Sequence, residues 1–149
     1  MVIMDKLFES KSDELVIVPG KTVLIVEDDI DCADSIKIKL ENRGYRIVTA
    51  FDGLIALDMA RDLQPDLVIL DIRVPGLSGY HVCRLLKFDE RYRKIPIIML
   101  TGKVDRESRE MGIKAGADKY ITKPFEFTEL LAEVSRLLEG QSASTGEIA

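Results

Sequence analysis

The chain has 149 residues, a formal net charge of −5, 46% hydrophobic residues and 32% charged residues, which is typical of one globular domain with an ordinary core. The acidic balance argues against a nucleic-acid surface, which would need a basic patch. No apolar run approaches the roughly 20 residues of a membrane span, and the N-terminal stretch lacks the basic leader of a secretory signal.

Residues 1–20 do not follow the pattern of the rest and are predicted to be an N-terminal leader. From Lys21 on, strand and helix patterns alternate up to residue 139, and the Gly/Ser/Thr-rich residues 140–149 are predicted to be a flexible tail. Strands are predicted at 22–26, 45–49, 66–70, 96–100 and 119–122. Helices are predicted at about 30–43, 53–62, 78–87, 105–115 and 127–138, with Asp29, Ser78 and Asp105 as N-terminal caps.

This order corresponds to five β–α units, and it predicts an α/β fold with a doubly wound parallel sheet and right-handed crossovers. The runs 22–26, 67–70 and 96–100 are almost wholly apolar, so we expect them to be central strands that are buried on both faces. The strand at 45–49 contains Arg46 and Thr49, which indicates an edge position.

The cysteines and the histidine offer no metal site of their own. Cys32 and Cys83 have no partner at a metal-ligand spacing, and we interpret them as small buried residues of a reducing compartment. His81 is the only histidine, so it cannot build a histidine-based metal site or catalytic triad alone. We therefore expect a cytoplasmic protein without a membrane contact.

Polar side chains follow the predicted strands where each strand ends. Glu27 and Asp28 follow the first strand, Asp71 the third, Thr101 the fourth and Lys123 the fifth. In a parallel sheet these ends meet at one edge, where ligands bind in open α/β sheets.

The residue types at this edge suit phosphoryl chemistry. Three converging carboxylates repel one another unless a cation neutralises them, and Mg²⁺ prefers such oxygen ligands. Lys123 supplies a positive point charge for a phosphate, and the amide of Gly102 can approach an anion. A carboxylate can attack phosphorus, and Asp71 is the natural nucleophile because it directly follows the central strand. The metal and Lys123 would stabilise charge during an in-line transfer.

Four motifs together resemble the receiver domain of two-component response regulators, of the single-domain type, over about residues 21–140. They are Val26-Glu27-Asp28-Asp29, Asp71-Ile72-Arg73-Val74-Pro75-Gly76, Thr101-Gly102 and Tyr120-Ile121-Thr122-Lys123-Pro124-Phe125. Each motif alone has an ordinary structural interpretation, such as a helix-dipole carboxylate or a half-buried strand aromatic. The resemblance implies a flavodoxin-like sheet with strand order 2-1-3-4-5.

The resemblance also implies roles for the site. Asp71 would accept a phosphoryl group from a sensor histidine kinase or a histidine phosphotransfer protein. Mg²⁺, or Mn²⁺ in its place, would be held by Glu27, Asp28, Asp71 and the backbone carbonyl of Arg73. The protein would catalyse its own phosphoryl transfer and a slow autodephosphorylation, without being a classical enzyme.

The resemblance further implies a switch. Thr101, Gly102 and Lys123 would bind the phosphoryl group, and a cis bond would join Lys123 to Pro124. On phosphorylation Thr101 would move inward and the ring of Tyr120 would follow, which would change the 105–138 surface that an unknown downstream effector reads.

Two departures from the family pattern stand out. Arg73 and Lys103 place basic side chains two residues after Asp71 and after Thr101, and we expect them to tune the lifetime of the phosphoryl group. Arg73 could also pair with Glu27 and partly replace the cation.

The other departure concerns a phosphorylation-dependent homodimer. Lys119 and Glu133 carry the opposite charges to those at the dimer contact of winged-helix relatives. Either the contact is kept with its charges exchanged, or the chain does not dimerise in that way, which is the interpretation that we favour.

Four other functions fit these residues less well. An aspartyl-phosphate phosphohydrolase would carry a second acid where Arg73 stands, and a flavin carrier would need a hydroxyl- or glycine-rich loop in place of residues 27–29. A receiver-like interaction scaffold without phosphorylation is disfavoured by the intact site residues Asp28, Asp71, Thr101 and Lys123. A dinucleotide site lacks its G-x-G-x-x-G motif.

Overall fold

The computed structural model describes residues 20–102 and 106–148, and it describes side chains up to residue 139. Lys103, the predicted cap Asp105 and the predicted leader up to residue 19 lie outside the described residues. The elements in chain order are β1 (Thr22–Val26), α1 (Ile30–Glu41), β2 (Arg46–Ala50), α2 (Gly53–Leu63), β3 (Leu67–Asp71), α3 (Gly79–Lys87), β4 (Ile97–Thr101), α4 (Arg106–Lys114), β5 (Lys119–Thr122) and α5 (Phe127–Ile148).

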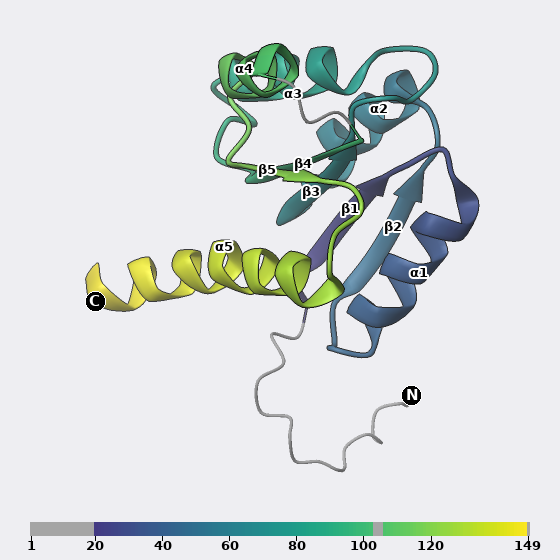
Figure 1. Cartoon of the computed structure of the whole chain (residues 1–149). Coiled ribbons are helices and arrows are strands. Elements are labelled where there is room, and N and C mark those ends of the chain that lie inside the picture. Colours follow the sequence, from purple (N-terminus) through teal and green to yellow (C-terminus); the bar gives the residue numbers. More distant parts are fainter. Residues whose placement is uncertain (1–19, 103–105, 149) are drawn as a thin grey trace.

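The strands form one parallel sheet in the order β2-β1-β3-β4-β5, as predicted (Figure 1). The register pairs Val26 with Leu70 and Thr101 with Thr122. The residues that follow these strands are therefore neighbours at the carboxyl edge of the sheet. The strand expected at the edge, β2, does lie at one edge.

Helices cover both faces of the sheet. The helices α1 and α5 pack on one face, and α2 and α3 pack on the other (Figure 1). Every residue of β3 and β4 is buried, as expected for strands covered on both sides. The core between the sheet and the helices α2 and α3 contains Leu24, Val68, Leu70 and Met99 from the strands, and Ala56, Ala60, Val82 and Leu86 from the helices.

The helices α1 and α3 begin at the side-chain caps that the sequence predicted. Asp29 accepts a hydrogen bond from the amide of Cys32, and Ser78 accepts one from the amide of His81. Such caps satisfy amides that have no partner within the helix. Capping therefore fixes the start of α1 directly after the acidic pair at the end of β1.

Several element ends differ from prediction by one or two residues, as in β2 and α1, and three differences bear on the site or on the C-terminal helix. Asp71 and Thr101 are the last residues of β3 and β4 rather than the first residues after them, because the backbone ladder continues past the apolar run. The last helix was predicted to end at Leu138, but α5 continues to Ile148 and extends beyond the sheet (Figure 1). Glycine disfavours a helix by about 1 kcal/mol relative to alanine, which is too little to force an end at Gly140.

Within the described part of the chain, none of the helices combines the length and the apolar character needed to cross a membrane.

Candidate functional site

Three carboxylates meet at the carboxyl edge of the sheet. Glu27 and Asp28 follow β1, and Asp71 ends the neighbouring strand β3. One oxygen of each carboxylate lies within 4.8 Å of the others. Glu27 and Asp71 are only 1% and 6% exposed, whereas Asp28 is exposed. The fold therefore brings together the acidic residues that the sequence pointed to, and it buries two of them.

Lys123, which follows β5, forms ion pairs with both buried carboxylates. The ammonium of Lys123 donates hydrogen bonds to Glu27 Oε1 at 2.7 Å and to Asp71 Oδ2 at 2.9 Å. The backbone of the lysine is fixed by its own amide, which donates to the carbonyl of Thr101 at 2.6 Å. The peptide bond from Lys123 to Pro124 is cis, as predicted.

Burial and charge act in opposite directions on these groups. Burial raises the pKa of Glu27 above its ordinary value, the hydrogen bond from Lys123 opposes this, and the nearby Asp71 adds to it. Burial alone would lower the pKa of Lys123, but its hydrogen bonds to Glu27 and Asp71 raise that pKa above its ordinary value. The lysine is therefore charged at neutral pH, and the site is a partly buried network of ions.

Backbone amides hold the remaining carboxylate oxygens. The amide of Arg73 donates to Asp71 Oδ1 at 2.9 Å, and the amide of Asp29 donates to Glu27 Oε2 at 3.2 Å. The side chain of Arg73 is exposed, and the cation that pairs with Glu27 in the structure is Lys123. The expected pairing of Arg73 with Glu27 is therefore not the arrangement of the described chain.

The loop that follows Asp71 is packed tightly against its surroundings. The amide of Gly53, at the start of α2, donates to the carbonyl of Pro75, and the amide of Gly79 donates to the carbonyl of Ile72. A Cβ atom at Gly79 would collide with the backbone carbonyl oxygen of Asp71. These contacts hold the loop that carries the backbone of Arg73 in a fixed position beside the acidic cluster.

The residues expected to sense a phosphoryl group lie on β4 and β5. Thr101 is 1% exposed, and its neighbour Leu100 is in register with Asp71. A Cβ atom added at Gly102 would have no other atom within 4 Å, so the space around this residue is open. The ring of Tyr120 is half-buried, with the guanidinium of Arg109 5.9 Å from its centroid.

Sequence reasoning missed a contact on the α4 side of the site. A cavity of about 440 Å³ is lined by residues from the β3–α3 loop, from α3, β4 and α4: Ile72, Arg73, Tyr80, Thr101, Glu107, Ser108 and Met111. The hydroxyl of Tyr80 donates to the backbone carbonyl of Ser108 at 2.9 Å. Tyr80 fitted the apolar pattern of its helix, and no sequence signal indicates which carbonyl its hydroxyl reaches.

The donor set fits a hard divalent cation. Three carboxylates supply only oxygen ligands, and the exposed Asp28 leaves access for water. Mg²⁺ binds through few carboxylates and keeps several waters. Glu27, Asp28 and Asp71 are therefore the residues that could hold such an ion.

Comparisons with known sequences agree with this site. A family model described as "Response regulator receiver domain" matches residues 23–135. The chain is 42% identical over 116 residues to the DNA-binding dual master transcriptional regulator RpaA of Synechocystis sp., covering 78% of this chain and 48% of RpaA. It is 43% identical over 119 residues to the phosphate regulon transcriptional regulatory protein PhoB of Pseudomonas aeruginosa, covering 80% of this chain and 52% of PhoB. The chain thus spans about half the length of the curated relatives it matches.

Solved structures agree as well. A putative response regulator from Chloroflexus aurantiacus matches with a TM-score of 0.77 and 35% identity, over 82% of this chain and 99% of that chain. The BeF3-activated DrrB receiver domain matches with a TM-score of 0.71 and 38% identity, over 80% of this chain and 97% of that chain. These similarities extend over nearly the whole of both solved chains.

Proposed function

The chain belongs to the response regulator receiver family, and from that premise we propose that Asp71 is the residue that accepts its phosphoryl group. One observation carries this assignment. The buried carboxylate of Asp71 lies between the ammonium of Lys123 and the amide of Arg73, with two further carboxylates within 4.8 Å. Glu27 contacts the same ammonium at 2.7 Å, so what distinguishes Asp71 is its place at the end of the central strand β3.

The transfer follows from these contacts. One oxygen of Asp71 attacks phosphorus, and the bond from phosphorus to the donor histidine nitrogen breaks. The electron pair of that bond returns to the imidazole nitrogen, which takes up a proton. Mg²⁺, or Mn²⁺, held by Glu27, Asp28, Asp71 and the backbone carbonyl of Arg73, would supply charge neutralisation on the phosphoryl oxygens.

The other residues of the site bind the transferred group. The ammonium of Lys123 has three donors, and it already contacts the carboxylate that becomes phosphorylated. The hydroxyl of Thr101 and the amide of Gly102 supply neutral hydrogen-bond donors. The chain then catalyses only its own phosphorylation and a slow autodephosphorylation, so it is not a classical enzyme.

The donor would be a sensor histidine kinase or a histidine phosphotransfer protein in the cytoplasm. The phosphorylated state would be read through Thr101 and Tyr120 on the surface that includes α4, β5 and α5. RpaA and MtrA are named as DNA-binding proteins, but the net charge of this chain is −5. We therefore assign the output to a downstream partner rather than to direct nucleic-acid contact by this domain.

The reversed charges on β5 and α5 bear on dimerisation. Lys119 Nζ lies 3.6 Å from Glu133 Oε2 in the same chain, and Arg136 also pairs with Glu133 at 2.8 Å. Since both charges are used within one chain, we propose that this face does not form a phosphorylation-dependent homodimer through them. Light scattering of the phosphorylated protein tests this. A dimer broken by Lys119→Glu and restored by adding Glu133→Lys would refute it.

Arg73 and Lys103 are proposed to tune the lifetime of the phosphoryl group. The exposed side chain of Arg73 lines the cavity beside Thr101, where it can affect the approach of water to the acyl phosphate. The half-life of phosphorylated protein, followed on phosphate-affinity gels, should differ between the unaltered chain and an Arg73→Ala, Lys103→Ala double variant. Identical half-lives would exclude the tuning role.

Beryllofluoride, a stable mimic of a phosphoryl group, tests the main proposal. Isothermal titration calorimetry should show binding that requires Mg²⁺ and is lost in Asp71→Asn. The control is Asp58→Asn, which removes an exposed carboxylate of α2 and should bind normally. Absence of binding by the unaltered protein would instead favour the interaction scaffold that is not regulated by phosphorylation.

A further inference from the structure

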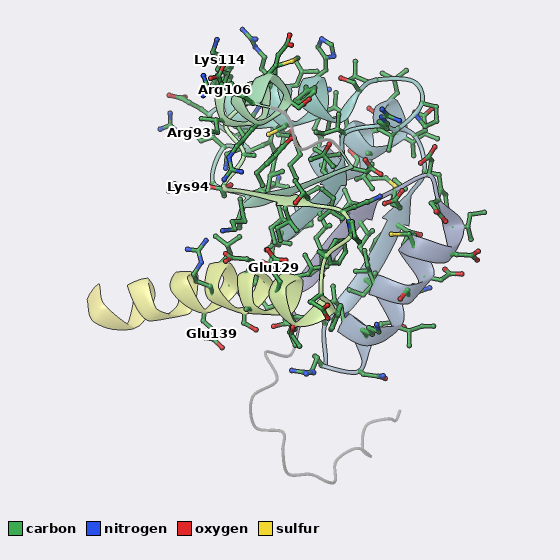
Figure 2. The ribbon with its side chains drawn as sticks, in the orientation of Figure 1. Arg93, Lys94, Arg106, Lys114, Glu129 and Glu139 are labelled. Atoms are coloured by element: carbon green, nitrogen blue, oxygen red, sulfur yellow. The ribbon has the colours of Figure 1, made fainter. Side chains whose placement is uncertain are left out.

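The helix next to the site, α4, is held to the domain by little apolar surface. Of its residues Arg106–Lys114, whose two ends are labelled in Figure 2, only Ser108 and Gly112 are buried. Its large apolar side chains, Met111 and Ile113, are 46% and 63% exposed. Because stabilisation by burial scales with apolar area, individual contacts with neighbouring elements decide how firmly this helix is placed.

Two tyrosines from neighbouring elements make such contacts. The ring of Tyr120, on β5, lies so close to Gly112 that an added Cβ would be 2.9 Å from ring atom Cδ1. From α3, the hydroxyl of Tyr80 donates to the backbone carbonyl of Ser108 at 2.9 Å. The Tyr80–Ser108 hydrogen bond therefore joins α3 to the N-terminal half of α4.

This hydrogen bond spans the wall of the cavity beside the site. Tyr80 and Ser108 both line that cavity, together with Thr101 and Arg73. Thr101 ends β4, and α4 starts at Arg106, so only a short segment connects them. Because Thr101 and Ser108 line the same cavity, a movement of Thr101 toward Asp71 would alter the wall against which the first turn of α4 packs. A hydroxyl hydrogen bond is lost once its atoms are about 3.6 Å apart, so a shift of less than an ångström is enough to break it.

We propose that the Tyr80–Ser108 hydrogen bond holds α4 in the position of this structure, and that the phosphoryl-bound arrangement is reached only when this bond breaks. Tyr80 is then a positioning residue, because it acts through α4 and not on the reacting atoms. The link to phosphoryl binding rests on the proposed function, whereas the placement of α4 by Tyr80 does not.

Tyr80→Phe removes the hydroxyl and keeps the ring. Tyr45→Phe is the matched control, because Tyr45 is buried in the core on the opposite face of the sheet, among residues of α1 and β1. Hydrogen exchange, followed by mass spectrometry, should be about fivefold faster for α4 amides in Tyr80→Phe, the effect of one ordinary net hydrogen bond. Exchange in β1 and β3 should not change. Unchanged exchange in α4, or equal acceleration in Tyr45→Phe, would overturn the proposal.

Beryllofluoride titration in the presence of Mg²⁺ tests the link to the site. If binding must break the hydrogen bond, its prior removal lowers the cost, and the Kd of Tyr80→Phe should fall by up to about fivefold. An unchanged or higher Kd, despite faster exchange in α4, would show that the bond does not oppose phosphoryl binding. If the unaltered protein does not bind beryllofluoride, the proposed function and the link both fail, while the exchange rates still decide whether Tyr80 places α4.

Discussion

Replacing Lys123 by alanine should destabilise the folded chain by about 2–3 kcal/mol at neutral pH. The ammonium contacts Glu27 at 2.7 Å and Asp71 at 2.9 Å, and these two side chains are 1% and 8% exposed. Removing one partner of a buried ion pair costs roughly 3–5 kcal/mol, since it leaves an uncompensated charge. The lysine side chain is 27% exposed, so water screens part of the interaction and lowers the expected cost to about 2–3 kcal/mol.

Urea unfolding followed by circular dichroism measures this loss. In the presence of a chelator the full effect should appear, and millimolar Mg²⁺ should recover part of it, because the metal would neutralise the same carboxylates. Lys114→Ala is the control, since Lys114 is an exposed lysine at the end of α4 (Figure 2), and it should change stability by no more than about 0.5 kcal/mol. A loss in Lys123→Ala no larger than that of the control would refute the reasoning.

Three further predictions concern the titration and packing of other groups. Burial raises the pKa of Glu27 above 4.5, so its stabilising contribution is complete below about pH 4.5 and is lost as the pH rises through the folded-state pKa. In the presence of a chelator, the free energy of unfolding should fall less steeply with rising pH in Glu27→Gln than in the unaltered chain. An equal slope in both would contradict the raised pKa of Glu27. Burial raises the pKa of the Cys83 thiol to about 12, so in a Cys32→Ser background a disulfide reagent at about pH 8 should modify it roughly 10³ times more slowly than in urea; similar rates would show that the thiol is accessible. Gly79→Ala should cost about 1–3 kcal/mol in urea unfolding, because its Cβ would collide with the carbonyl oxygen of the last residue of β3, whereas Gly102→Ala, with nothing within 4 Å, should be nearly neutral.

Local patterns were enough to predict the strands and the edge position of β2, whereas the strand order came from the family resemblance. The apolar runs of β1, β3 and β4 indicated burial on both faces, and Arg46 and Thr49 indicated the edge position of β2, which the strand order confirms. The ends of the strands were harder to predict from the sequence. Asp71 and Thr101 were placed after their strands because they are polar, but a backbone ladder depends on main-chain groups and continues through them. Their burial is tolerated because the tertiary fold supplies partners that no local pattern reveals.

The residues of the candidate site could be predicted from sequence, but their pairing could not. Lys123 was expected to bind a phosphoryl group, and Arg73 was expected to compete for Glu27. In the structure Glu27 pairs with Lys123. The amide of Lys123 donates to the carbonyl of Thr101, and from this position the lysine side chain contacts both Glu27 and Asp71. Reach of this kind depends on tertiary distances rather than on periodicity. The Tyr80–Ser108 hydrogen bond escaped prediction for the same reason.

The sharing of one cation gives the proposed switch a physical basis. The ammonium of Lys123 has three donors, and two of them are used by Glu27 and Asp71. A phosphoryl group brings a charge of about −2 in place of a single carboxylate charge, so it competes for the lysine more strongly than Asp71 did. Glu27 is 1% exposed and cannot exchange the lost contact for water. Bound Mg²⁺ would then add to the neutralisation of Glu27, so we expect it to stabilise the phosphorylated state.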